Sequence, residues 1–158
     1  MKPPNPPEGY HTLTPGLTVR DASATIAFYE KAFGAAELYR LTLPDGTIAH
    51  AEFRIGDSVF MIQDERPEWG TPSPETLGGA PLRLRLYVED ADASFAAAVA
   101  AGATETMPVE LQFWGDRMGS VVDPFGYHWL IATRVEDVPV GEYQARMEAF
   151  FVEGGGSS

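Results

Sequence analysis

The chain has 158 residues, of which 44% are hydrophobic, and its formal net charge is −12. This acidity excludes the basic surface that nucleic-acid binding requires, and the sequence has no run of about 18 apolar residues that would span a membrane. The chain has no cysteine, which excludes disulfides and thiolate chemistry and is typical of a cytoplasmic protein.

Residues 1–9 are rich in proline and lack the apolar stretch of a signal peptide, so we expect a disordered, extended arm. The pattern over residues 10–66 predicts a first βαβββ module. Its helix is expected over 22–33, with Asp21 as N-cap and Gly34 as C-cap. Its expected strands are 12–19, 37–43, 49–55 and 59–63.

The pattern then repeats after a Pro/Gly-rich linker or lid at residues 67–81. The sequence VRDASAT at 19–25 is echoed by VEDADAS at 88–94, and AFGA at 32–35 by AAGA at 100–103. This repeat predicts a second module over 82–136. Its helix is expected over 91–101 and its strands over 82–88, 104–107, 119–122 and 127–133.

Residues 137–158 are expected to form a C-terminal amphipathic helix, over 138–152, and a loose tail. We expect the helix to pack on a sheet or on a partner subunit. Each module is too small to bury its own sheet, so the two modules are predicted to form one structural domain. The fold class is therefore α+β, with two tandem βαββ(β) modules.

The turn near residue 124 has strong sequence signals. Asp123 is suited to cap it, Pro124 sets φ for its first central position, and Gly126 supplies a positive φ. A hairpin with strands on either side of this turn is predicted.

These motifs resemble those of the vicinal oxygen chelate superfamily, which includes glyoxalase I, extradiol dioxygenases, and fosfomycin- and bleomycin-resistance proteins. The resemblance rests on VRDA, FY and FGA near the start and on GDRxG and DPFG near the end, and it covers residues 10–136. HAE at 50–52, GDSV at 56–59 and QFWGDR at 112–117 are most similar to the PhnB-like branch. The resemblance implies a U-shaped mixed sheet around a cavity, and dimerisation.

In the metal-using members of that superfamily, four cavity-facing residues bind one divalent ion. The resemblance places these positions at Thr14, Met61, Arg83 and Leu130. None of these side chains is a good ligand for a catalytic divalent ion, and an arginine adds a competing positive charge. We therefore predict no metal and no other cofactor.

Strand alternation predicts which side chains face the cavity. If the leucines of 82–88 pack on a helix, then Arg83, Arg85 and Tyr87 face the cavity, as do His50 and Glu52 in the first module. Such a wall suits a small polar organic ligand. Alternatively, this face is merely solvated, and the two arginines pair with glutamates across strands.

Two further features have a functional and a structural interpretation. The pair of His50 and Glu52 is either half of a relocated metal or acid–base site, or a polar contact. The loop 112–118 borders the cavity in the family, which makes its polar and aromatic side chains ligand-binding candidates. Alternatively, an Asp–Arg pair stabilises this loop and its tryptophan lies in a dimer contact. The loop candidates are Gln112, Trp114, Asp116 and Arg117.

The function predicted from these observations is metal-independent, dimeric binding of a small molecule, similar to drug-sequestering resistance proteins. The alternative is a glyoxalase-like lyase or isomerase, or a dioxygenase, with a divalent metal at a relocated site such as His50 and Glu52 with His128. A third possibility is a dimeric interaction protein whose cavity is filled by side chains. Catalytic residues are not assigned, and neither nucleic acid nor a membrane is expected as a partner.

Overall fold

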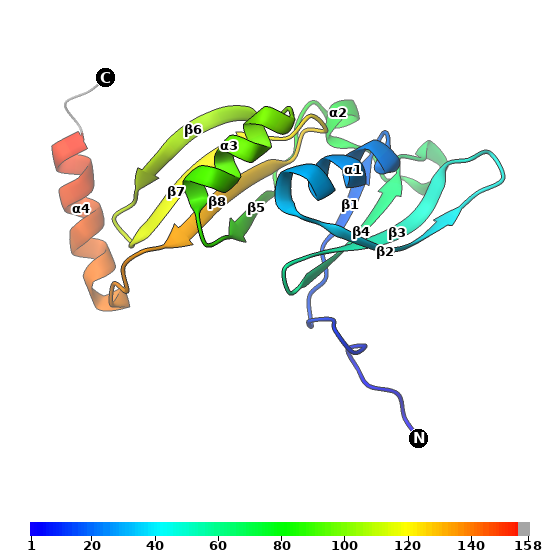
Figure 1. Ribbon diagram of the computed structural model, residues 1–158, viewed down its shortest axis with the longest axis horizontal. Helices are drawn as coiled ribbons and strands as arrows, with labels where there is room; N and C mark the ends of the chain where they lie inside the picture. The colour runs from blue at the N-terminus through cyan, green and yellow to red at the C-terminus, as the bar shows by residue number, and fades with distance from the viewer. Residues whose placement is uncertain (155–158) are drawn as a thin grey trace.

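The computed structural model describes residues 1–154 and contains two modules with the same order of elements (Figure 1). In the first module the strand order is β1-β4-β3-β2, with β1 parallel to β4 and the other neighbours antiparallel. Its elements are β1 (Gly16–Val19), α1 (Ala22–Phe33), β2 (Ala36–Thr42), β3 (Ile48–Ile55) and β4 (Ser58–Asp64).

The second module repeats this topology with the strand order β5-β8-β7-β6, again with a parallel pair, β5 with β8. Its elements are β5 (Arg83–Tyr87), α3 (Ala91–Ala101), β6 (Thr104–Leu111), β7 (Asp116–Val122) and β8 (His128–Arg134). The predicted α+β class with tandem modules is confirmed. The two sheets are separate hydrogen-bonded units within the chain.

Two strands of the second module are longer than the sequence predicts. The sequence predicts that β6 ends near residue 107, just before Pro108, and that β7 begins only at residue 119. β6 continues past Pro108 because it is an edge strand and its register with β7 shifts between Met107 and Glu110. An edge position and an irregular register both tolerate a residue without an amide donor.

The remaining elements are short or peripheral. The segment between the modules contains η1 (Pro67–Trp69) and α2 (Pro74–Leu77). After β8 come η2 (Val140–Glu142) and α4 (Tyr143–Gly154), and Figure 1 shows α4 at the far end of the second module. The predicted loose tail overlaps the end of α4, and residues 155–158 lie outside the described part. No helix within residues 1–154 is long and apolar enough to cross a membrane.

Both long module helices begin at the predicted aspartate caps. Asp21 Oδ1 accepts a hydrogen bond from the amide of Ala24 at 2.9 Å, and Asp90 Oδ1 accepts one from Ala93 at 3.0 Å. Each cap satisfies an amide at the start of its helix, which stabilises a helix by about 1 kcal/mol. The matched caps explain why the repeat is visible in the sequence.

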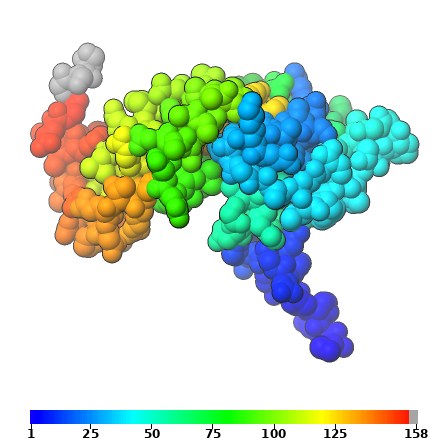
Figure 2. Space-filling model, viewed as in Figure 1, coloured from blue at the N-terminus to red at the C-terminus, as the bar shows by residue number. Residues whose placement is uncertain are grey.

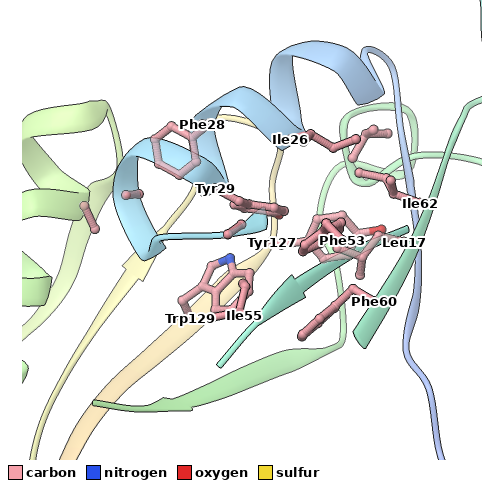
Figure 3. Packing of buried hydrophobic residues seen from close by; sticks show 14 of the residues in the cluster. Leu17, Ile26, Phe28, Tyr29, Phe53, Ile55, Phe60, Ile62, Tyr127 and Trp129 are labelled. Atoms are coloured by element: carbon pink, nitrogen blue, oxygen red, sulfur yellow. The ribbon is translucent and has the colours of Figure 1, made fainter. Parts of the chain in front are cut away.

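One hydrophobic core joins the two modules under their helices. Figure 3 shows Tyr29 of α1 beside Trp129 of β8, and their ring centroids are 5.2 Å apart. The ring of Phe33 lies 4.5 Å from that of Trp129, and both Tyr29 and Trp129 are fully buried. Aromatic contacts of this kind add about 0.5–1.5 kcal/mol each beyond the buried area. The modules are therefore packed helix beside helix, as Figure 1 shows for α1 and α3.

The predicted turn after β7 also links the modules through hydrogen bonds. Asp123 is only 3% exposed, and its Oδ2 accepts hydrogen bonds from Tyr29 Oη at 2.6 Å and Trp129 Nε1 at 2.9 Å. Its Oδ1 accepts the amides of Phe125 and Tyr127 at 2.9 and 3.0 Å. Burial and the neighbouring carboxylate raise the pKa of Tyr29 well above its ordinary value, so its hydroxyl remains a donor.

We expect Tyr29→Phe to lower the free energy of unfolding by about 1.5–3 kcal/mol, because it removes one donor from a buried carboxylate. Urea unfolding of the purified protein measures this change. Tyr143→Phe is the matched control, since the half-buried Tyr143 makes no side-chain hydrogen bond within the described residues. Equal stability of the two variants would contradict the role given to Asp123.

Candidate functional site

Each sheet has one face packed on a helix and one opposite face, which we call its open face. In β3 the side chains of Ala51, Phe53 and Ile55 enter the core. His50 and Glu52 alternate with them and lie on the open face, as predicted from the strand period. Met61 is the partner of Glu52 in the neighbouring strand, so it shares that face.

Four side chains on the first open face form what we call the Glu52 cluster. Glu52 is 3% exposed, and its Oε2 lies 2.7 Å from His50 Nε2. The hydroxyl of Tyr39, from β2, donates to the same Oε2, while the hydroxyl of Tyr10 donates to Oε1. The cluster therefore holds one buried carboxylate between two phenols and an imidazole.

These contacts set the ionisation of the cluster. Burial raises the pKa of Glu52, but hydrogen bonds from Tyr10, Tyr39 and His50 outweigh burial and hold the pKa below its ordinary value. The hydrogen bond between Tyr39 and Glu52, together with burial, raises the pKa of Tyr39 to about 12. At neutral pH Glu52 is thus an anion and both phenols are protonated donors.

A second group on the other open face, the Asp116 cluster, contains Arg85, Tyr87, Trp114 and Asp116. Asp116 is 2% exposed, and its Oδ2 accepts hydrogen bonds from Trp114 Nε1 at 2.8 Å and Tyr87 Oη at 3.1 Å. Arg85 Nη1 lies 3.6 Å from the same oxygen. The Arg85 guanidinium also stands over the Trp114 ring, 5.6 Å from its centroid.

Gly115 makes the turn that places Trp114 and Asp116. Its φ is +99°, and a Cβ there would lie 2.3 Å from the carbonyl oxygen of Glu136. The carbonyl of Gly115 accepts the amides of Val135 and Glu136 at 3.0 and 3.1 Å. Only glycine satisfies both the positive φ and this close approach.

Other predicted site residues lie outside the two clusters. Arg117 is on the helix-facing side of β7, where it forms a bidentate ion pair with Asp92 at 2.6 and 2.8 Å. Gln112 Nε2 donates to the carbonyl of Glu110 at the end of β6. Arg83 is exposed on the second open face, where it is the register partner of His128.

The pairings expected from the sequence differ from those in the structure. Arg85 pairs with Asp116 rather than with a glutamate on another strand. Asp116 and Arg117 do not pair with each other, because adjacent residues of a strand point to opposite faces. Sequence reasoning also missed Tyr10 and Tyr39. Tyr39 is the register partner of Glu52, but this register shifts within the hairpin, so counting residues does not predict it.

Each cluster borders a hollow. Tyr10, Tyr39 and Glu52 line one of about 440 Å³, together with Thr14 and Met61. The Asp116 cluster lines another of about 350 Å³, to which Arg134 and Tyr143 also contribute. The two hollows share no residue. The side chains expected around one cavity thus form two separate half-sites within this chain.

Comparison with known proteins gives the family. The family model described as the Glyoxalase/Bleomycin resistance protein/Dioxygenase superfamily matches residues 10–131. The chain is 44% identical over 140 residues to the Mycobacterium tuberculosis protein Rv0887c, covering 87% of this chain and 82% of that protein. The chain therefore belongs to this superfamily, as its motifs indicate.

Solved structures share the fold. TioX from Micromonospora sp. ML1 is 26% identical, with a TM-score of 0.62 over 78% of this chain and 98% of TioX. A PhnB protein from Bacillus cereus is 20% identical, with a TM-score of 0.61 over 78% and 99% of the two chains. A bleomycin-binding protein complexed with bleomycin is 23% identical, with a TM-score of 0.56 over 78% and 98%.

We expect Tyr39→Phe to raise the pKa of Glu52, because it removes a hydrogen bond to the ionised carboxylate. NMR titration of the side-chain carboxyl carbons measures this pKa. In the wild type the folded-state pKa lies below the unfolded one, so this contribution to stability is present above the ordinary glutamate pKa and is lost on acidification. Tyr143→Phe should leave the pKa of Glu52 unchanged. If Glu52 had the same pKa in Tyr39→Phe as in the wild type, the hydrogen bond between Tyr39 and Glu52 would be refuted.

Proposed function

We propose that this protein is a metal-independent, dimeric small-molecule-binding protein whose ligands lie against the open faces of its sheets. One observation carries the proposal: each open face has a buried carboxylate, held by aromatic donors, at the edge of a hollow. A few fixed polar groups within aromatic and apolar surroundings are typical of sites for organic ligands. The shared fold with a bleomycin-binding protein supports a drug-like ligand.

The chemistry of the open faces supports independence from metal. Thr14 and Met61 line the first hollow, while Leu130 packs against Met118 and Ala132 on the second open face. A thioether and an aliphatic side chain are poor ligands for a hard or borderline divalent ion, and a single threonine hydroxyl is a weak one. Within residues 1–154, no three histidine, aspartate or glutamate side chains are grouped closely enough to hold a metal ion.

The pair of His50 and Glu52 favours a second candidate, a lyase, isomerase or dioxygenase. Their 2.7 Å contact is typical of a general base with an orienting carboxylate. The same two side chains are also potential metal ligands, but an ion would need further ligands. His128, the further ligand that this alternative names, lies in β8 of the other module. Within residues 1–154 it does not group with His50 and Glu52.

A thermal-shift screen separates the two candidates, since any compound that binds the folded state raises the melting temperature. We expect Mg²⁺, Mn²⁺, Ni²⁺ and Zn²⁺ to give no specific rise, and polar aromatic compounds to give rises that decrease in Arg85→Ala or His50→Ala. Arg20→Ala, on the exposed surface, is the control for nonspecific effects. A stoichiometric ion whose effect disappears in His50→Ala would favour the enzyme instead.

The C-terminal helix supports dimerisation. None of the residues of α4 is buried, and Phe151 and Val152 are 65% and 80% exposed. A helix of this length is only marginally stable in water without packing, and grouped apolar side chains of this kind are typical of an interface. We propose that α4 packs against the second chain, which is one of the two alternatives predicted from its amphipathic sequence.

Sedimentation velocity tests this arrangement. We expect a dimer for the wild type and a shift toward monomer for Phe151→Ser/Val152→Ser, because burial of these side chains is lost. Val99→Ser, a similar change at an exposed position of α3, should leave the dimer intact. A monomeric wild type would refute the dimer, and an unaffected double variant would exclude α4 from its interface.

A further inference from the structure

The N-terminal segment, residues 1–15, runs to the start of β1 without helix or strand. Figures 1 and 2 show its first residues standing clear of the first module. Residues 1–9 are exposed, and the first half-buried side chain along the segment is Tyr10. This side chain belongs to the Glu52 cluster, so the segment reaches the candidate site.

Few contacts hold this segment on the open face. The hydroxyl of Tyr10 donates to Glu52 Oε1, and His11 Nε2 lies 3.2 Å from the carbonyl oxygen of Asp57 in an exposed contact. The amide of Tyr10 bonds to Pro7 within the segment itself. At the end of the segment the amide of Met61 donates to the carbonyl of Pro15 at 2.9 Å. Since exposed contacts stabilise little, the Tyr10 hydroxyl is the principal anchor of the residues before Pro15.

The two oxygens of Glu52 are satisfied in different ways. Oε2 accepts from His50 and Tyr39, which both lie on strands of the sheet. Oε1 has Tyr10 as its donor, and Tyr10 lies on the N-terminal segment. If the segment moves away, a buried, ionised oxygen loses its donor, which is costly unless another donor takes its place.

The hollow beside Oε1 has walls suited to an aromatic ring. Its volume is about 440 Å³; Tyr39, Glu52 and Met61 of the sheet line one side, and residues of the N-terminal segment line the other. Movement of the segment away from the sheet would leave Tyr39 and Met61 as the wall beside Oε1. Thioether and aromatic walls favour a flat apolar body, while Oε1 requires one hydrogen-bond donor.

The charges around the cluster favour a neutral donor over a cation. His50 already bonds to Glu52, and the Arg54 guanidinium lies beside Gly9, where a Cβ would be 3.3 Å from its Nη2. The same guanidinium is close enough to oppose the rise in the pKa of Tyr10 that Glu52 causes. An organic ammonium would therefore meet positive charge, whereas a phenol would not.

We propose that an aromatic compound with a phenolic hydroxyl binds against Tyr39 and Met61, donates to Glu52 Oε1 in place of Tyr10 and displaces the N-terminal segment. The Tyr10 side chain is then an internal substitute for the ligand. This inference rests on the proposed small-molecule binding and adds the class of ligand and the segment that competes with it. Because the segment occupies the site in the free protein, it lowers the apparent affinity for the ligand.

The test uses 2-naphthol as the probe and the full-length protein, with calorimetry or naphthol fluorescence as the readout. We expect Tyr10→Ala to bind 2-naphthol about tenfold more tightly than the wild type, because the competing hydroxyl is gone. Leu13→Ala, at an exposed position of the same segment, should bind like the wild type. The methyl ether, 2-methoxynaphthalene, should bind Tyr10→Ala at least about tenfold more weakly than 2-naphthol, because it cannot donate.

Three results would overturn the inference: equal 2-naphthol affinity in the wild type and Tyr10→Ala, equal affinity for the ether, or tighter binding of 2-naphthylmethylammonium. Since Tyr10 is partly exposed on a peripheral segment, its replacement should leave the fold intact, and circular dichroism checks this. If 2-naphthol does not bind, but another compound does and its binding depends on Arg85, the proposed function stands and this inference falls. If no organic compound binds, both fall.

Discussion

The burial of the Asp123 carboxylate is the constraint on which the arrangement of the two modules depends. A carboxyl group that is only 3% exposed is costly to bury unless hydrogen-bond donors surround it. Two donors are amides of its own turn, one is the indole of Trp129, and one is the hydroxyl of Tyr29 in the other module. The same turn brings the hydroxyl of Tyr127 to the backbone of β1. Without this packing of the modules, the buried carboxyl group would lose the hydrogen bond from Tyr29.

In this helix-beside-helix packing the helices cover the faces opposite the open ones, and the N-terminal segment lies against the first open face. The carboxylates of the protein illustrate the difference between structural and functional burial. Asp123 is enclosed by core aromatic rings, whereas Glu52 and Asp116 are equally buried but lie at the edges of hollows. Hydrogen bonds to a core carboxylate fix the fold, while those to a carboxylate at a hollow can be exchanged for bonds to a ligand. The proposed binding therefore concerns the open faces and not the core.

Much of the candidate site follows from the two-residue period of strands. From the sequence alone, that period predicts that His50 and Glu52, like Arg85 and Tyr87, point away from the helix side of their strands, and the strand register agrees. The same period explains why the side chains of Asp116 and Arg117 point to opposite faces of β7, although the sequence of the loop suggests that both border the cavity. Tyr10 escapes prediction because its partner is 42 residues away and no local pattern indicates that contact.

The sequence by itself determined the repeated modules, their capped helices, the turn at Asp123 and the superfamily, because caps, turns and strand alternation are local features that residue type controls. Only the tertiary structure decided which donors surround Glu52 and Asp116, how β6 accommodates Pro108, and that the expected cavity residues divide into two half-sites. These depend on register shifts and on contacts between distant segments. Such contacts are set by the packing of the whole chain, in which a shift of one residue moves a side chain to the opposite face.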